Sequence, residues 1–324
     1  MSDSHLIVLA IGGNSLIRDE AHRTVADQWA LTRDTCHHVA HIIEAGHNVV
    51  ITHGNGPQVG FILRRSELAR QELHEVPLDS CDADTQGAIG YMIQQSLANE
   101  FRRRGMNRLA VTVVTQVEVA SDSPAFTHPS KPVGAFMDEA TARDRAARNG
   151  WAIAEEVGHG WRRVVPSPEP LGIIELDAIR HLVAAGFVVT AVGGGGIPVT
   201  RDAAGDLHGV EAVIDKDLAS ALLARLLGAD LLVISTNVQQ VCLNFGKPGE
   251  RAFDRLTLGE AKRYLAEGHF GAGSMAPKIQ GIIRFLESGG RRAIVTCPAD
   301  LEDAIAGNAG TEFVAPSAVR GPGV

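Results

Sequence analysis

Several features that define other protein classes are missing from this chain of 324 residues. No apolar run approaches the roughly 20 residues that a membrane-spanning helix needs. The start of the chain has no basic segment followed by an apolar stretch, so no secretory signal is visible. The 35 glycines follow no three-residue period, which excludes a collagen-like protein. Hydrophobic residues make up 45% of the chain and charged residues 21%, which excludes a disordered one.

Cysteine and positive charge are both scarce. The four cysteines lie far apart and form no CxxC pair, which is typical of free thiols in a reducing compartment, so we expect a cytoplasmic protein. They are Cys36, Cys81, Cys242 and Cys297. The formal net charge is −8 and the only basic run is Arg102-Arg103-Arg104. Because nucleic acid demands a basic surface, neither it nor a membrane is an expected partner.

Lysine is rarer still, since it supplies only five of the 30 basic residues. A chain that uses arginine almost throughout can keep lysine for places where a compact ammonium is needed. Codon bias is the alternative explanation. The five are Lys131, Lys216, Lys247, Lys262 and Lys278.

Short apolar runs alternate with helical patterns along the chain. Continuous apolarity indicates strands that are buried on both faces, as in parallel sheets. The predicted strands span 6–11, 48–52, 109–114, 187–192, 230–235 and 292–296, and the predicted helices 24–45, 57–74, 84–104, 175–185, 217–227 and 275–288. This rhythm predicts a single α/β domain over 1–324, a three-layer α/β/α sandwich with a mainly parallel central sheet. The proline-rich stretch 121–170, with Trp151 and Trp161, interrupts it and predicts an inserted, protruding lobe or lid.

Three predicted strands end in glycine-rich turns, where ligands of open α/β sheets bind. The turns are Gly12-Gly13-Asn14, Gly54-Asn55-Gly56 and Gly193–Gly196. Glycine lets backbone N–H groups approach an anion, and the following helix adds a favourable dipole. A tight strand-to-helix turn needs glycine in any case, so one such turn alone would be weak support. The P-loop, GxGxxG and GxSxG motifs are absent, which counts against P-loop enzymes, Rossmann dinucleotide binding and α/β-hydrolases.

Three of the five lysines lie beside turns of this kind. Lys131 is in the proline-rich insertion, Lys216 stands between Asp215 and Asp217 at a helix start, and Lys278 follows the glycine loop 271–273. Each alone fits a solvated surface residue. Together they favour phosphoryl transfer, which needs positive charge on the oxygens of the moving group and little covalent help.

At these residues the chain resembles carbamate kinase, a member of the amino acid kinase fold family. The matching segments run from about residue 6 to residue 314. They are Gly12-Gly13-Asn14, His53–Gly60, Gly160–Pro168, Gly193–Pro198, Ala212–Asp217 and Gly273–Lys278. The resemblance implies reversible phosphoryl transfer between ATP and carbamate, giving ADP and carbamoyl phosphate, with Mg²⁺ carried by the nucleotide and a homodimeric assembly. It leaves open whether arginine or purine breakdown supplies carbamoyl phosphate.

The resemblance also implies roles for individual residues. Gly12, Gly13 and Asn14 would surround the transferred phosphoryl group, and Gly54, Asn55 and Gly56 would hold carbamate. Lys131 would reach the phosphoryl group from the lobe, Lys216 and Lys278 would neutralise phosphates, and Asp217 would orient the lysines. The expected nucleotide contacts are Asp215, Lys216, Thr236, Asn237, Gly273, Ser274, Met275 and Lys278.

One departure from the family pattern lies at Ser235-Thr236-Asn237, where the family usually has Leu-Thr-Asp or Leu-Thr-Ala. It favours one alternative, a paralogue that binds nucleotide or carbamoyl phosphate as a regulatory subunit. A small-acid kinase of the same fold is a second alternative that stays open. The run Cys36-His37-His38-x-x-His41 resembles a metal cluster, but no carboxylate or second cysteine stands at ligand spacing nearby. A solvated helix face is the favoured interpretation, so no metal site is predicted.

Overall fold

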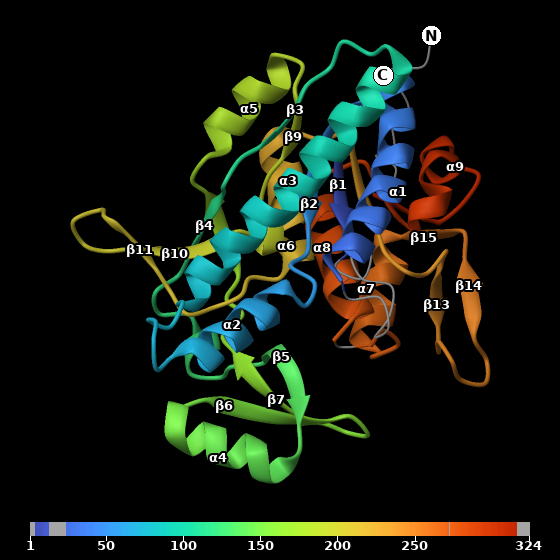
Figure 1. Cartoon of the computed structure of the whole chain (residues 1–324). Helices are drawn as coiled ribbons and strands as arrows, with labels where there is room; N and C mark the ends of the chain where they lie inside the picture. Colours follow the sequence, from blue (N-terminus) through green and yellow to red (C-terminus); the bar gives the residue numbers. More distant parts are fainter. Residues whose placement is uncertain (1–3, 13–23, 272, 316–324) are drawn as a thin grey trace.

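The computed structural model describes residues 4–12, 24–271 and 273–315. Its centre is an eight-stranded sheet with the order β15-β17-β16-β12-β1-β2-β9-β3 (Figure 1). All neighbouring pairs are parallel except β16 and β17. The strands are β1 Leu6–Ile11, β2 Asn48–His53, β3 Ala110–Thr112, β9 Val188–Thr190, β12 Leu231–Ser235, β15 Arg255–Thr257, β16 Arg292–Thr296 and β17 Thr311–Val314.

Helices cover both faces of this sheet. Alternate residues of β1 supply two separate cores: Ile7 and Leu9 face one, and Val8 and Ala10 face the other. Helices α1, α3 and α9 pack on the first core, and α5, α6, α7 and α8 on the second. The predicted three-layer α/β/α sandwich is therefore confirmed. The helices are α1 Val25–Glu44, α2 Gln58–Ala69, α3 Leu78–Arg104, α4 Glu139–Asn149, α5 Leu176–Ala184, α6 Lys216–Leu227, α7 Leu258–Ala266, α8 Met275–Glu287 and α9 Leu301–Ala306.

Local signals set most helix ends. Thr24 and Thr257 begin α1 and α7 through capping boxes, and α3, α4 and α6 end at glycines in the left-handed conformation. Two predicted boundaries are wrong: α2 ends at Ala69 rather than 74, and α3 begins at Leu78 rather than 84. The first turns of α3 bury Asp82 beside Cys81. Because a carboxyl stands at a buried position, the sequence shows no continuous apolar helical face before residue 84.

After β3 the chain leaves the central sheet and builds two smaller ones, one of which is completed by β10 and β11 after β9. A three-stranded sheet, β5-β7-β6, carries α4 and forms the unit at the bottom of Figure 1, here called the lobe (residues 131–165). Its strands are β5 Lys131–Met137, β6 Ala152–Glu156 and β7 Gly160–Val165. The remaining strands are β4 Gln116–Val119, β8 Pro170–Ile173, β10 Ile197–Arg201 and β11 Leu207–Gly209 in a four-stranded sheet, and β13 Val241–Leu243 and β14 Arg251–Phe253 in a hairpin.

Candidate active site

The carboxyl ends of β2, β1 and β12 lie side by side. Ile11, the last residue of β1, pairs with His53 of β2 and with Ser235 of β12. The chain continues the ladder for one more bond on each side: Gly12 N–H donates to the Ser235 carbonyl at 2.9 Å, and Gly54 N–H to the Ile11 carbonyl at 3.0 Å. The turns that follow these strands are therefore neighbours.

Two of these turns were predicted to bind substrate. Of the first, only Gly12 belongs to the described residues, and Gly13 and Asn14 lie outside them. The second turn contains Gly56 at a φ of 54°, a left-handed conformation that suits glycine. The structure therefore places Gly12 beside the 54–56 turn, as the predicted substrate site requires.

Helix α3 holds the 54–56 turn through the side chain of Asn55. The amide Nδ2 donates to Asp82 Oδ1 at 2.7 Å, and the Thr85 hydroxyl donates to Asn55 Oδ1 at 2.7 Å. Asn55 is only 9% exposed. Protein groups therefore occupy two of the hydrogen-bonding positions of this amide.

The third glycine turn, Gly193–Gly196, is buried and close-packed. A Cβ at Gly193 would lie 2.4 Å from His53 Nε2, and one at Gly194 would lie 2.1 Å from Asn55 Oδ1. Real Cβ atoms do not approach other atoms so closely, so only glycine fits here. Packing against protein groups is thus sufficient to require glycine at these positions, whether or not their N–H groups also approach an anion.

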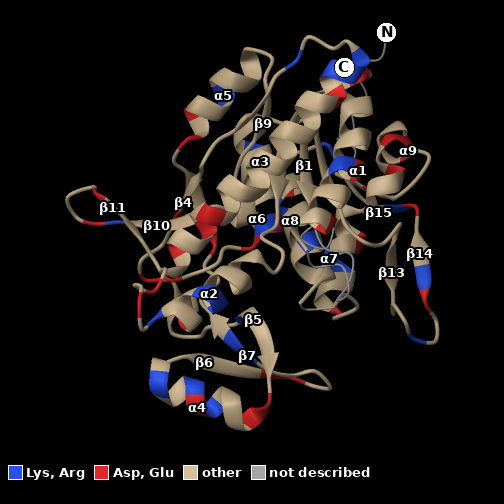
Figure 2. Ribbon diagram, in the orientation of Figure 1, with Lys and Arg blue, Asp and Glu red and all other residues tan. Residues whose placement is uncertain are grey.

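Two lysines share one buried carboxylate. Lys216 Nζ lies 2.5 Å from Asp217 Oδ1, and Lys278 Nζ lies 3.1 Å from Asp217 Oδ2. The three side chains are only 10%, 14% and 5% exposed for Lys216, Lys278 and Asp217. Lys216 belongs to α6 and Lys278 to α8, and Figure 2 shows blue Lys or Arg segments where these two helices adjoin. The cluster has two positive charges against one negative, so it can attract a phosphoryl group.

Burial and charge act against each other in this cluster. Burial alone would raise the pKa of Asp217, but the ammonium groups of Lys216 and Lys278 lower it. Burial also lowers the pKa of Lys216, as does the nearby Lys278, against the opposing attraction of Asp217. Asp217 is therefore held as a carboxylate and is unsuited to act as a general base.

Two packing features position this cluster. A Cβ at Gly281 of α8 would lie 2.7 Å from the Asp217 carbonyl oxygen, so glycine allows α8 to cross α6 closely. Lys278, one turn earlier on α8, reaches Asp217 as a result. The Ser220 hydroxyl lies 2.6 Å from the Thr52 hydroxyl, which ties α6 to the end of β2.

Lys131 joins the same region from the lobe. Its Nζ lies 2.6 Å from Asp215 Oδ2, and Asp215 Oδ1 accepts a hydrogen bond at 2.9 Å from the Asp217 N–H. Asp215 is the N-cap of α6, so one carboxylate links the helix start to the lobe. The structure therefore brings Lys131, Lys216, Asp217 and Lys278 into one connected group.

The residues predicted for the nucleotide side lie around the end of β12 and the start of α8. Thr236 is buried and its hydroxyl is 3.4 Å from the side-chain oxygen of Asn237, which is itself exposed. The Ser274 carbonyl accepts a hydrogen bond from Lys278 Nζ at 3.3 Å, and Met275 packs partly buried against the core. Gly273, which directly precedes Ser274, lies in the same turn. Of these residues, Ser274 is linked to the cluster through Lys278.

Sequence reasoning missed two features: the polar face of α3 and the hydrogen bond from the His53 ring to the 54–56 turn. Gln86 Nε2 donates to the carbonyls of Thr115 and Gly193 at 3.0 and 2.9 Å, which ties the third turn to α3. Burial lowers the pKa of His53 to about 4, so the ring is neutral and Nδ1 carries the proton that it donates to the Gly54 carbonyl at 3.0 Å. The signal was present, since residues 82, 85 and 86 have helical i, i+3, i+4 spacing.

Two of the three histidines of α1 contact carboxylates from distant parts of the chain, and the third, His41, contacts Glu44 of the same helix. His37 Nδ1 lies 3.3 Å from Glu100 of α3, and His38 Nδ1 lies 3.1 Å from Glu302 of α9. His37 is half-exposed. Across residues 4–12, 24–271 and 273–315, the structure contains no group of three or more His, Cys, Asp or Glu that could hold a metal ion.

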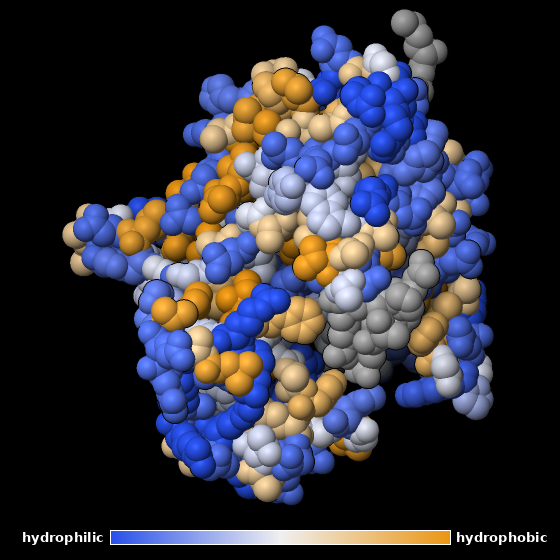
Figure 3. Space-filling model, in the orientation of Figure 1, coloured by the Kyte–Doolittle hydropathy of each residue, from blue (hydrophilic) through white to orange (hydrophobic). Residues whose placement is uncertain are grey.

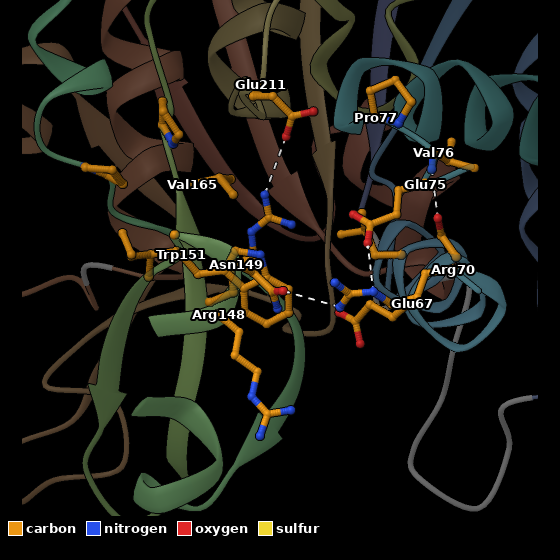
Figure 4. Close-up of a pocket in the computed structure, with 18 of the residues that line it drawn as sticks. Glu67, Arg70, Glu75, Val76, Pro77, Arg148, Asn149, Trp151, Val165 and Glu211 are labelled. Carbon is orange, nitrogen blue, oxygen red and sulfur yellow. Dashed lines mark hydrogen bonds and ion pairs between the residues drawn. The ribbon is translucent and has the colours of Figure 1, made fainter. Parts of the chain in front are cut away.

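A large cavity of about 870 Å³ separates the lobe from α2 and the start of α3 (Figure 4). Two long polar contacts bridge it: Arg163 of the lobe lies 3.4 Å from Glu211, and Arg70 donates to Asn149 of the lobe at 3.4 Å. The face of Trp151 lines its lobe side, with the Arg163 guanidinium 5.0 Å from the ring centre. The lysine cluster does not line this cavity.

Known proteins resemble this chain along nearly its whole length. The amino acid kinase family matches residues 5–297. Carbamate kinase-like protein YahI of Escherichia coli K12 is 49% identical over 312 residues, which cover 95% of this chain and 98% of that protein. The carbamate kinase of Thermococcus kodakarensis is 47% identical with the same coverage.

Solved structures agree with these relatives. Carbamate kinase from Giardia lamblia bound to AMP-PNP is 40% identical with a TM-score of 0.90, covering 98% of this chain and 100% of that one. An N-acetylglutamate synthase from Neisseria gonorrhoeae, 15% identical with a TM-score of 0.58, shares the fold alone. This chain belongs to the amino acid kinase family and, within it, to the carbamate kinases.

Proposed function

We propose that this chain transfers a phosphoryl group reversibly between ATP and carbamate, giving ADP and carbamoyl phosphate. The observation that carries the proposal is the buried cluster of Lys216, Asp217 and Lys278. It is tied through Ser220 and Thr52 to the end of β2, next to the glycine turns. Phosphoryl transfer is catalysed mainly by positioning and by charge on the moving group, and this cluster supplies both.

In the proposed reaction a carbamate oxygen attacks the γ-phosphorus of ATP. The bond between that phosphorus and the oxygen that bridges it to the β-phosphate breaks, and ADP leaves with the electron pair. Lys216 and Lys278 neutralise the phosphate oxygens, and Asp217 holds both ammonium groups in place. Carbamate is already an anion, so the attack needs no general base. The backbone of Gly12 and of the 54–56 turn would face the reacting groups.

We expect the nucleotide to enter with Mg²⁺ as part of the substrate. Magnesium keeps several waters and is usually held by one or two carboxylates together with the substrate phosphates. Both carboxylates at this site, Asp215 and Asp217, already bond to lysines. Phosphate oxygens of the nucleotide, together with water, would therefore be the main ligands of the ion. The ion would neutralise the negative charge of these oxygens.

The lobe would close over the site and deliver Lys131. A Cβ at Gly60 of α2 would lie 2.9 Å from the Gly134 Cα of β5, so the lobe contacts the body closely at this point. Along the last turns of α2, the 870 Å³ cavity leaves space between the lobe and the body. Besides this packing, the lobe meets the body through the Lys131–Asp215 pair and the two long polar contacts across the cavity. Exchangeable polar contacts bordered by open space allow the lobe to rotate as a rigid body.

A homodimer and a cytoplasmic location complete the proposal. Strand β3 is an edge of the central sheet, and Leu109 and Val114 beside it are 64% and 52% exposed. Figure 3 shows hydrophobic atoms gathered where Figure 1 places β3, β4 and α5. An apolar sheet edge favours pairing with a second copy, which light scattering on the purified protein would detect. All four cysteines are free, and none of the described helices is long and apolar enough to cross a membrane.

The test is a coupled assay of ATP formation from ADP and carbamoyl phosphate. We expect ATP at a rate that is proportional to enzyme concentration and lost in Lys278→Met. A purified, folded protein that binds ADP but forms no ATP would support the regulatory paralogue instead. Activity with an amino acid carboxylate and none with carbamoyl phosphate would support the small-acid kinase.

A further inference from the structure

Asp82 is a buried carboxyl group with one hydrogen-bond partner. It lies in the second turn of α3 and is 1% exposed. Its Oδ1 accepts the hydrogen bond from Asn55, and its Oδ2 is buried with no partner among the described residues. Burying a polar group without a hydrogen-bond partner costs stability. A functional role for its one contact would explain why the chain keeps a carboxyl at this position.

That contact decides which way the Asn55 amide faces. The Thr85 hydroxyl has one proton and two acceptors within reach, Asn55 Oδ1 at 2.7 Å and the Asp82 carbonyl at 2.8 Å, so it does not by itself fix the orientation of the amide. Asp82 accepts a hydrogen bond from the nitrogen end of the amide. Gly194 has no Cβ, which leaves room for the Asn55 amide at this place. Without an acceptor at residue 82, rotation of the amide by 180° would cost less, and the peptide groups of the 54–56 turn would lose their support.

We propose that Asp82 is a positioning residue for carbamate and carbamoyl phosphate: its carboxyl orients the Asn55 amide and so holds the 54–56 turn in its binding conformation. This inference rests on the proposed function, in which that turn receives the substrate. It assigns a role on the substrate side of the reaction, distinct from the lysine cluster on the phosphate side.

The charge state of Asp82 fits this role. Burial raises the pKa of Asp82 well above its usual value, and the nearby Asp79 and Glu211 raise it further, against the hydrogen bond from Asn55. The group is therefore kept uncharged over a wide pH range. An ionised carboxylate behind this turn would repel an anionic substrate, whereas a neutral carboxyl provides the acceptor oxygen without that repulsion.

Three variants test the proposal in the ATP-forming assay. In Asp82→Ala we expect KM for carbamoyl phosphate to rise at least about tenfold and KM for ADP to change less than about twofold. Asp82→Asn keeps an acceptor oxygen and no charge, so it should stay within about threefold of the wild type for both substrates. Asp84→Asn, the same change at an exposed position two residues along α3, is the matched control and should leave both constants unaltered.

Other outcomes would overturn the proposal. Equal rises in both KM values for Asp82→Ala would show a general loss of structure instead of substrate positioning. A defect in Asp82→Asn as large as that in Asp82→Ala would remove the acceptor argument.

Two measurements do not depend on catalysis, so they separate failure of this inference from failure of the proposed function. The first is a crystal structure of Asp82→Ala. If Asn55 and the 54–56 turn are unmoved in it, the positioning role is refuted even if the enzyme acts on another substrate.

The second measurement is the melting temperature as a function of pH. A carboxyl with a raised pKa keeps its proton in the folded state after the unfolded chain has released it, so folded stability falls as pH rises above about 4. Wild type should therefore lose stability relative to Asp82→Asn as pH increases, and parallel curves would contradict a buried neutral Asp82.

Discussion

The lysine cluster in the body and the lysine on the lobe are built differently. Lys216, Lys278 and Asp217 lie between two packed helices and are at most 14% exposed. Lys131 begins a strand of a three-stranded sheet, is 34% exposed, and contacts the body through Asp215. One site therefore combines charges that are fixed in the core with a charge that the lobe carries.

The difference indicates how each part can act. Removing one partner from a buried, paired charge costs about 3–5 kcal/mol, so the cluster cannot exchange partners easily and keeps its geometry through the reaction. A partly exposed pair such as Lys131 with Asp215 contributes only about 1 kcal/mol, so Lys131 can leave the carboxylate for a phosphoryl oxygen. Fixed charges suit preorganised stabilisation of the transition state, and an exchangeable one suits closure.

Arginine at the two buried lysines should have the largest effect. A guanidinium is wider and flatter than an ammonium and cannot take the same place beside Asp217 and a phosphate oxygen. We expect Lys216→Arg and Lys278→Arg each to lower kcat about a hundredfold in the ATP-forming assay.

Lys262 is the matched control for this pair. It is about half-exposed on α7 and pairs with Glu287 on α8. Lys262→Arg should keep full activity and an unchanged melting temperature. Full activity in Lys216→Arg and Lys278→Arg as well would mean that the scarcity of lysine reflects codon bias and that the phosphate-binding assignment is wrong.

Gly281→Ala should reach the same site without altering a charged group. The added Cβ would meet the Asp217 carbonyl and push α8 away from α6, which displaces Lys278. We expect kcat to fall by about ten- to a hundredfold and the free energy of unfolding by about 1–3 kcal/mol. Gly259→Ala, at a helical glycine where a Cβ meets nothing within 4 Å, is the control. Unchanged kcat in Gly281→Ala would show that the close crossing does not position Lys278.

Lys131→Arg should lose less than the buried variants, because a movable lobe can adjust to the larger group. We expect kcat to fall about tenfold and the melting temperature to stay within about one degree. Kinetic measurement beside Lys216→Arg sharpens the comparison. A loss in Lys131→Arg equal to or greater than that in Lys216→Arg would mean that the lobe holds its lysine as rigidly as the body does.

The smallest effect is expected at Asn237. It is exposed beside Thr236 and makes no contact with the lysine cluster. We expect Asn237→Asp to change KM for ADP about three- to fivefold with little change in kcat, the pattern of altered uniform binding. If instead the wild type is almost inactive and Asn237→Ala restores kcat, the chain is a degenerate paralogue.

The sequence predicted the layers of the fold and the lysine cluster better than the polar contacts that hold the 54–56 turn. Apolar strands such as 6–11 and 230–235 and the lysines beside glycine-rich or acidic turns are local signals. The contacts of Lys131 and Lys278 with their carboxylates nevertheless span 84 and 61 residues. The contact between Asn55 and Asp82 joins a turn to a helix interior 27 residues away. The helical spacing of residues 82, 85 and 86 indicates a polar face, but nothing local identifies the partner of that face. The same holds for Gly193–Gly196, whose glycines serve packing that only the tertiary structure reveals.

The most direct test of a fixed cluster with a mobile lobe lysine is a crystal structure with a nonhydrolysable ATP analogue and Mg²⁺, compared with the free enzyme. The account predicts that the contacts of Asp217 with Lys216 and Lys278 are retained. It also predicts that the lobe rotates as a unit and that Lys131 leaves Asp215 for the γ-phosphate. A lobe in the same position in both structures, with Lys131 still on Asp215, or a cluster that comes apart on binding, would contradict the account.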